Sequence, residues 1–290
     1  MTLAAPPPVT EAIVAFAAGA WAFRAGARDA ARPLLLATIL DAMAGADTER
    51  TAIGAAAWAP GLPRSRAHAI GRPAPASATG AAFLTALAAD NAALATPVVA
   101  AALATGESTA AGGAVVLDAV IAGIDVAARL QRALGSVHAA RGWDVRGTCG
   151  RIGAAIAAAR ILGLQRAALR DAIGIAATAA GGLANAAGTM TSAYIAASAA
   201  ADGVEAALLA RAEFSAAPLA LEGRRGLATL MSDQLDASAF EGLGNRVAFG
   251  TTQLPRALDA DERALRVRDL IARVERLPVI AELVAATMPA

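Results

Sequence analysis

Alanine is by far the commonest residue in this chain, and aromatic residues make up only 3% of it. Alanine is the strongest helix former, and no run alternates apolar and polar residues for long enough to predict a strand. Small residues recur at three- and four-residue spacing, as in Gly150, Gly153, Ala154 and Ala157, and this spacing lets neighbouring helix backbones approach closely. Close approach is how a chain with few bulky side chains reaches native packing density. We therefore predict an all-α helical bundle without a sizeable sheet.

Helical segments of ordinary length follow from the spacing of the apolar residues. Thr10 is suited to cap the first of them, because a threonine hydroxyl accepts a hydrogen bond from a free amide at a helix start. Loops are predicted at 59–80, 135–147 and 184–195, where glycine, proline and polar residues gather. A helix is also predicted over LLLATILDAMAG (34–45), because Pro33 stands where a proline is tolerated in a first helical turn. The other predicted helices are 11–23, 109–134, 148–162, 165–180, 196–213, 261–276 and 278–287.

The charged residues exclude several classes of function. Basic and acidic residues nearly cancel, 25 against 24, which argues against nucleic acid as the main partner. The chain contains no lysine, so Schiff-base chemistry and phosphate binding by a P-loop lysine are excluded. Cys149 is the only cysteine, and the two histidines, His68 and His138, are far apart in the sequence. We therefore expect no disulfide framework, no metal site and no cofactor.

The uncharged stretch 172–201 raises the question of a membrane span. It is built mainly of Ala, Gly, Thr and Ser, whose transfer into hydrocarbon is weak, and it contains Asn185. A buried helix pair is the favoured interpretation, and no membrane partner is expected. The N-terminal segment has no basic region and carries Glu11 before its apolar run, unlike a secretory signal. We predict a cytoplasmic protein.

The segment 141–150 holds the densest group of chemically useful side chains. Arg141 and Arg146 are able to grip a substrate carboxylate, while Asp144 or Cys149 is able to move a proton. The alternative is that this segment has only a structural role. Trp143 then packs into the core, and the charged side chains pair with each other on the surface. The side chains in question are Arg141, Trp143, Asp144, Arg146, Thr148 and Cys149.

The segment GWDVRGTCGRIGAAIAAARILGLQRAALRDAIGIAATAAGGL resembles the central stretch of the 2-methylcitrate dehydratase (MmgE/PrpD) family. That family carries a glycine-rich loop there, then an alanine-rich helix ending in LLGL, then a second helix. Further segments agree with the family in consistent order, so the resemblance covers most of residues 10–235. These segments are 31–46, 76–90, 96–107, 116–130 and 190–227.

The resemblance implies a domain organisation. It predicts a main helical part at 10–240 and closing helices at 261–290, since 266–286 resembles the helices that end such chains. Only a linker at 241–260 then stands where the family has its second, lid domain. The resemblance thus implies one all-α domain over 1–290. It also implies a homodimer, as family members usually are.

The resemblance implies an altered active site. Family enzymes dehydrate, isomerise, epimerise or decarboxylate small polycarboxylates with histidines and a lysine. Here Asp144 and Arg146 stand at the positions of the family's histidine and threonine in the central loop, and Asp90 stands at an acidic position. The family's Met-Thr-Lys stretch is Met190-Thr191-Ser192, and Ile195 takes a nearby histidine position. Three of the usual proton-handling or anion-binding groups are therefore replaced.

Two classes of function remain open, with a third behind them. The leading hypothesis is a divergent enzyme that performs elimination, isomerisation or cyclisation on a small organic metabolite in a mostly apolar pocket, with secondary metabolism as one setting. The alternative is a catalytically inactive helical homodimer or a ligand-binding pseudoenzyme, and the third hypothesis is a citrate-type dehydratase. A cavity at Asp144 and Tyr194 favours catalysis, whereas a space filled by Trp143 and Ile195 favours the inactive dimer.

Residues are assigned to the leading hypothesis as follows. The catalytic candidates are Asp144, Tyr194, Asp90 and Cys149, with His138 as a further one, and the substrate-binding candidates are Arg141, Trp143, Arg146, Thr148, Met190, Thr191 and Ser192.

Overall fold

Helices dominate the structure, a computed structural model that describes residues 8–19, 23, 25–58, 67–250, 258 and 261–289. The strands in this part of the chain, β1 (Ala67–His68) and β2 (Pro75–Ala76), form one antiparallel pair. The prediction of an all-α fold without a sizeable sheet is confirmed.

The α-helices vary in length from one turn to 28 residues. Their bounds are α1 Val9–Ala17, α2 Ala25–Gly45, α3 Glu49–Trp58, α4 Ala78–Ala89, α5 Ala95–Ser108, α6 Gly113–Ala140, α7 Arg151–Ile161, α8 Arg166–Thr178, α9 Met190–Arg211, α10 Leu227–Met231, α11 Glu262–Ala272 and α12 Ala281–Ala285. Short helical turns of other types are η1 Arg146–Gly150, η2 Ala184–Ala186, η3 Ala237–Phe240 and η4 Val274–Arg276.

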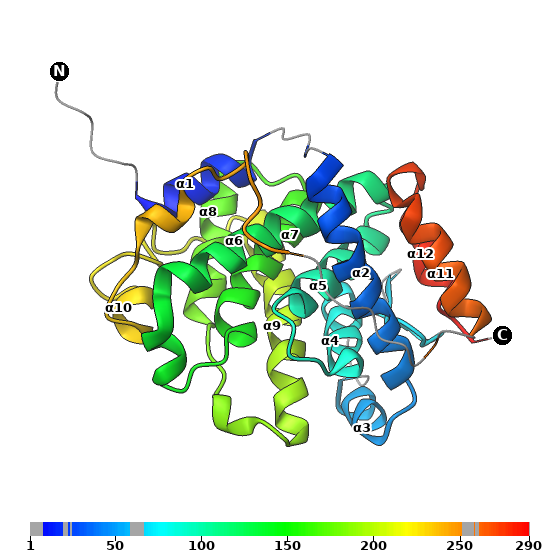
Figure 1. Cartoon of the computed structure of the whole chain (residues 1–290). Helices are drawn as coiled ribbons and strands as arrows, with labels where there is room; N and C mark the ends of the chain where they lie inside the picture. The colour runs from blue at the N-terminus through cyan, green and yellow to red at the C-terminus, as the bar shows by residue number, and fades with distance from the viewer. Residues whose placement is uncertain are drawn as a thin grey trace.

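Four helices form the centre of the bundle. α9 packs against α4, α5 and α7, and these also pack against one another as the pairs α4–α5 and α5–α7. Figure 1 shows α9 running beside α4 and α5, with α1 next to α8 at one end and α11 next to α2 at the other. One continuous cluster of buried apolar residues joins these elements. The core is thus built from helix faces that are mostly alanine.

Glycine allows the central helices to approach within backbone contact. A Cβ added at Gly123 of α6 would lie 2.5 Å from the carbonyl oxygen of Gly153, and one at Gly153 of α7 would lie 2.6 Å from that of Gly123. A Cβ at Gly203 of α9 would lie 2.5 Å from the Cβ of Ala154. These separations are shorter than van der Waals contact, so only glycine fits at each position. The small residues predicted to allow close approach therefore do so.

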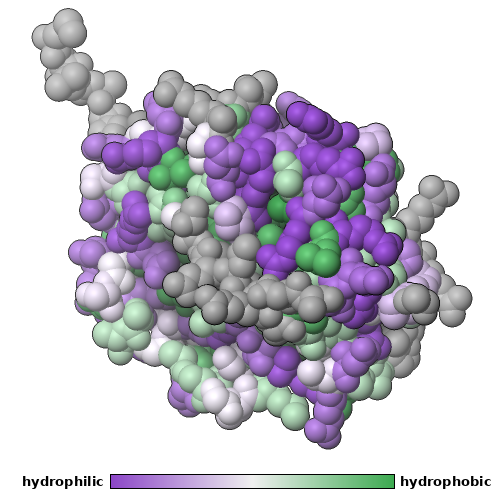
Figure 2. Space-filling view, turned by 45° about the vertical axis from the view of Figure 1, so that its right-hand side comes forward, coloured by the Kyte–Doolittle hydropathy of each residue, from purple (hydrophilic) through white to green (hydrophobic). Residues whose placement is uncertain are grey.

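The longest uncharged stretch of the sequence is buried inside the bundle. α9 is long and apolar enough to pass a length and composition test for a membrane span, but 67% of its most apolar window is buried in the protein. It packs against α8, as predicted for this stretch. On the face drawn in Figure 2, hydrophilic residues predominate and hydrophobic ones occur in separate small groups. α9 therefore has the surroundings of a core helix.

Several predicted helix ends are wrong, because tertiary contacts replace local capping. α9 begins at Met190 rather than at 196, and α1 spans Val9–Ala17 rather than 11–23. Thr10 does not cap α1 from outside. It lies within the helix, and its amide donates to the carboxylate of Glu222 at 3.1 Å. A residue 212 positions away thus supplies the acceptor for the start of this helix.

A buried ion pair fastens the segment after Ala239 to α6. Arg129 donates to Asp125 at 3.0 Å within α6, and both side chains are almost fully buried. Arg129 also donates to the carbonyl oxygens of Ala239 at 2.9 Å and Glu241 at 2.8 Å, and to that of Arg246. An arginine has five N–H donors, so one side chain satisfies carbonyls that no helix or strand would pair. This clamp orders a stretch without regular structure.

Part of the predicted linker lies outside the described residues. Residues 251–257 and 259–260 of the 241–260 segment are not described, nor are 59–66 of the predicted loop at 59–80. The division into a main helical part, a linker and closing helices stays a prediction.

We predict that Arg129→Met destabilises the protein by about 3–5 kcal/mol, because Asp125 and several carbonyl oxygens would remain buried without their partner. Urea unfolding followed by circular dichroism measures this change. Arg273→Met is the matched control, since Arg273 pairs with Asp269 on the surface, where their side chains are 54% and 68% exposed. Its cost should stay below about 1 kcal/mol, and equal losses in both variants would refute the clamp.

Candidate functional site

The segment 141–150 forms a turn between α6 and α7 that is held against the residues after α8. The amide of Asp144 donates to the carbonyl oxygen of Gly182 at 3.0 Å, and the amide of Gly181 donates to that of Gly147 at 3.2 Å. Trp143 pairs with Leu183 through a single β-bridge and is half-buried against the core. The turn ends in η1, a π-helical turn, a type that is rare and occurs often at functional sites.

Asp144 and Arg146 form a largely buried ion pair at the centre of this turn. Arg146 donates to the Asp144 carboxylate from Nη2 at 2.6 Å and from Nε at 3.0 Å. It also donates to the carbonyl oxygen of Asn91 at 3.0 Å and to the hydroxyl of Ser192 at 3.1 Å. Three segments distant in sequence thus meet at one guanidinium. The N–H donors of Arg146 named here are thus bound by protein atoms rather than by a ligand.

The charge state of Asp144 follows from this geometry. Burial alone would raise the pKa of the Asp144 carboxyl, but hydrogen bonds from the side chain and backbone of Arg146 outweigh it, and the pKa lies below its ordinary value. The carboxylate is therefore ionised at neutral pH and is a weak base. The sequence alone does not show which of these two opposed effects on the pKa is larger, and the ion pair in the structure outweighs burial.

Cys149 and Tyr194 lie in opposite environments. Cys149 is fully buried, and burial raises the pKa of its thiol to about 12, so it is protonated at neutral pH. Tyr194 is 51% exposed near the start of α9, where its ring stands edge-on to that of Phe83 at 5.9 Å. Neither residue forms a hydrogen bond or an ion pair with the side chains of Asp144 and Arg146. Their assignment as catalytic residues stays a prediction.

The other predicted site residues divide between the pair and the surface. Ser192 joins the pair, and the buried Thr148 donates to the carbonyl oxygen of Asp144 at 3.1 Å. Arg141 instead forms an ion pair with Asp233. Asp90 pairs with Arg50 at 2.7 Å, although the next residue, Asn91, contacts Arg146. Met190 and Thr191 are exposed at the start of α9.

Ile195 occupies the space behind the turn. A Cβ added at Gly147 or at Gly182 would lie 2.8 Å from the Cγ2 methyl of Ile195. That side chain is buried and is packed directly against both glycines. Ile195 therefore contributes to apolar packing against the turn.

A recess of about 440 Å³ lies on the other side of the turn. Its lining includes His138, whose Nε2 is 3.1 Å from the hydroxyl of Thr148. Burial lowers the pKa of His138, with the charge of Asp144 opposing the shift, so the imidazole is neutral at neutral pH. Polar side chains share this lining with small and apolar residues: Gln131, Arg132 and Ser136 with Ala128, Gly135, Ala139, Val145 and Ala248.

Gly135 explains why helical spacing did not predict this recess. It interrupts α6 with φ +65° and ψ −168°, a conformation that glycine adopts readily and other residues rarely. The residues after Gly135 therefore do not continue the helix faces of the residues before it. The grouping of His138 with Arg132 arises from this break.

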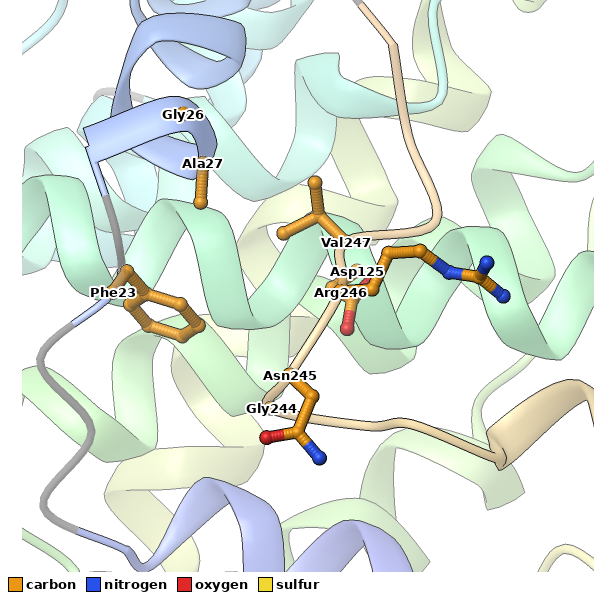
Figure 3. A pocket seen from close by; sticks show the side chains of 8 residues that line it. All are labelled: Phe23, Gly26, Ala27, Asp125, Gly244, Asn245, Arg246 and Val247. Atoms are coloured by element: carbon orange, nitrogen blue, oxygen red, sulfur yellow. The ribbon is translucent and has the colours of Figure 1, made fainter.

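A smaller recess of about 230 Å³ lies between α2, α6 and the segment 244–247. Figure 3 shows Phe23, Ala27 and Val247 around it, while the side chain of Arg246 extends away from them. Asp125 also lines it, but this carboxylate already binds Arg129 and the amide of Ala248. Among the described residues, no three His, Cys, Asp or Glu side chains converge as metal ligands do.

Comparison with known families decides the relationship of this chain. The model of the MmgE/PrpD N-terminal domain matches residues 11–239. The chain belongs to the MmgE/PrpD family. No curated protein matches it.

Membership of the family allows the residues of the turn to be compared with the site residues that the resemblance implies. This MmgE/PrpD chain carries Asp144, Ser192 and Ile195 where the resemblance implies the family's histidines and lysine. Asp144 and Ser192 both contact Arg146, and Ile195 fills the space behind the turn. Between the matched region and α11 at Glu262 only residues 240–261 remain, too few for a domain at that point.

We predict that Asp144→Asn destabilises the protein by about 3–5 kcal/mol at neutral pH, because Arg146 would remain buried without a counter-charge. The folded-state pKa of Asp144 is lowered, so its contribution is present above the unfolded-state pKa and is lost as pH falls through the folded-state value. The difference in free energy of unfolding between wild type and variant should therefore close below the ordinary value of 3.8.

Urea unfolding at a series of pH values measures this difference. Asp233→Asn is the control, because the Asp233 side chain is 70% exposed where it pairs with Arg141, and its loss should cost less than about 1 kcal/mol. A difference for Asp144→Asn that persists unchanged in acid would contradict the assigned charge state.

Proposed function

We propose that this chain is a divergent MmgE/PrpD-type enzyme that performs acid–base chemistry on a small organic acid. We place the reaction in the recess beside His138 rather than at the Asp144–Arg146 pair. The single observation that supports this is the position of the His138 imidazole in the lining of a 440 Å³ recess that also carries a guanidinium, an amide and a hydroxyl. Pockets of roughly 300–1,000 Å³ with a few polar groups are typical of small-molecule sites.

His138 has the properties of a general base. Its Nε2 faces the hydroxyl of Thr148, and that hydroxyl also donates to the carbonyl oxygen of Asp144. In this arrangement Nε2 carries the proton, and Nδ1 has the free electron pair. Nδ1 has no hydrogen-bond partner among the described residues, and His138 as a whole is 1% exposed. The proposal therefore requires the lining to open enough for a ligand to contact Nδ1.

Arg132 complements this base. One of its N–H groups donates to the carbonyl oxygen of Ala248, and its remaining donors have no partner among the described residues, so they are placed to bind a substrate carboxylate. In the proposed step, His138 takes a proton from the carbon next to that carboxylate. The electrons of the C–H bond move onto the carboxylate, where Arg132 stabilises the added charge. If a double bond is conjugated with this carbanion, the His138 imidazolium returns the proton to the far carbon of that bond, and the product is an isomer. If a hydroxyl stands on the neighbouring carbon, its C–O bond breaks as the new double bond forms, and the imidazolium gives its proton to the leaving oxygen, which departs as water.

A second candidate is a non-catalytic MmgE/PrpD member that acts by binding or assembly. The position of Ile195 favours it, because this side chain fills the space behind the turn and Asp144 is held by Arg146. Large apolar residues on the neighbouring surface, namely Leu183, Met190 and Tyr194, are each more than 50% exposed and are suited to contact a second copy. A homodimer and a cytoplasmic location are part of both proposals.

We predict that the protein exchanges a C–H hydrogen of a small carboxylic acid with deuterium from solvent and that His138→Gln slows this by about 100-fold or more. Malate, citrate and 2-methylcitrate serve as probes, with loss of their C–H signals followed by proton NMR in deuterated water. Because burial lowers the pKa of His138, the exchange rate should fall in acid with a midpoint below the ordinary value of 6.5.

His68→Gln is the matched control, because His68 is the other histidine of the chain and pairs with Glu107 on α5, away from the recess. Exchange that survives in both variants would reject His138 as the base. Absence of exchange with every probe, combined with a dimer in analytical ultracentrifugation, would favour the non-catalytic candidate. Exchange with 2-methylcitrate alone, lost in Asp144→Asn but kept in His138→Gln, would point to a citrate-type dehydratase.

A further inference from the structure

A third recess, of about 570 Å³, lies where the end of α8 meets the segment 217–231. Its deepest residues are apolar and nearly inaccessible to solvent: Ala177 of α8 is 9% exposed, and Leu227 and Met231 of α10 are 4% and 8% exposed. It shares no lining residue with the recess beside His138. An inference about it therefore goes beyond the proposed function.

The rim of this recess exposes large apolar side chains to water. Leu219 is 45% exposed and Leu230 is 67% exposed, and Pro218 stands beside them. Exposed leucines that border an apolar hollow are unfavourable in water unless a ligand covers them. The segment contacts α8 closely at its start, where a Cβ added at Gly174 would lie 3.2 Å from the carbonyl oxygen of Ala217, and the amide of Leu227 donates to the carbonyl oxygen of Ala220 at 2.9 Å. The hollow therefore lies between fixed elements.

Arg225 is the single charged residue in the lining. It is exposed, and it has neither an ion-pair nor a hydrogen-bond partner among the described residues. The acidic residue nearest in sequence, Glu222, instead accepts hydrogen bonds from Thr10. A guanidinium at the edge of an apolar hollow is able to bind a carboxylate with two parallel hydrogen bonds. The charge and the hollow together match an anion with an apolar tail.

We propose that this recess binds an amphiphilic monocarboxylate, with its aliphatic tail against Leu219, Leu230 and Met231 and its carboxylate on Arg225. The volume lies within the range of roughly 300–1,000 Å³ that small-molecule sites occupy. Thr178 and Arg225 are the only lining residues with polar side chains, and Thr178 already donates to the carbonyl oxygen of Gly174. An extended peptide, whose backbone requires many hydrogen bonds, would find few partners here.

Isothermal titration calorimetry with decanoate tests the proposal on the full chain. We expect saturable binding below the concentration at which decanoate forms micelles. Arg225→Gln should weaken it by about tenfold or more, because it removes a charge-assisted hydrogen bond. Arg224→Gln is the matched control, since Arg224 is also exposed but does not line the recess, and it should leave the affinity within about twofold.

The tail is tested separately. Acetate, which lacks the tail, and decanol, which lacks the charge, should each bind at least about tenfold more weakly than decanoate. Leu230→Ser should also weaken decanoate binding, and the exposure of this side chain makes unfolding of the variant improbable; thermal unfolding of each variant verifies its fold. No saturable binding of decanoate, equal losses in Arg224→Gln and Arg225→Gln, or equal affinity for decanol would each overturn the proposal.

Discussion

The structure depends on the close approach of helices that carry almost no bulk on their facing sides. Gly123 and Gly153 bring the backbones of α6 and α7 into contact, and Gly203 does the same for α9 against α7. Dispersion forces between small groups are effective only at such short separations, because each atom pair contributes little. In this alanine-rich chain, the interior is therefore densely packed because helix backbones lie close together, whereas most proteins fill their interior with large side chains.

The same tight packing determines where a ligand has room. At the 141–150 turn, Gly147 and Gly182 pack against Ile195, so an apolar side chain occupies the position that the resemblance gives to a histidine. Recesses occur instead where regular helices stop: at the break of α6 by Gly135 and where α8 meets the irregular segment 217–231. Residues that end helices, rather than those that build the core, therefore shape the candidate binding surfaces.

Arginine performs the structural roles that lysine shares with it in other proteins. Arg129 satisfies carbonyl oxygens of Ala239 and Glu241, and Arg146 joins the 141–150 turn to Asn91 and to α9. Arg151 holds the same turn by donating to the carbonyl oxygen of Gly147 at 2.9 Å. A planar group with five donors is suited to such tasks, since it satisfies several acceptors at once. Where an arginine binds only protein atoms, it supports the fold. Arg132 and Arg225 have donors without a partner in the part of the chain that the structure describes, and such donors are able to bind ligands.

The sequence by itself determined the fold class, the family and the small-residue packing, because composition and helical spacing act through local preferences and short-range contacts. It also placed Asp144 and Arg146 in one turn, although it left their charge balance open. The tertiary structure alone decided that Arg146 lowers the pKa of Asp144, that Ile195 fills the space behind them, and that His138 lines a recess. These features require segments about 50 residues apart to meet, and such contacts have no signature in local periodicity. The break of α6 at Gly135, by contrast, falls where the sequence predicts the helix 109–134 to end.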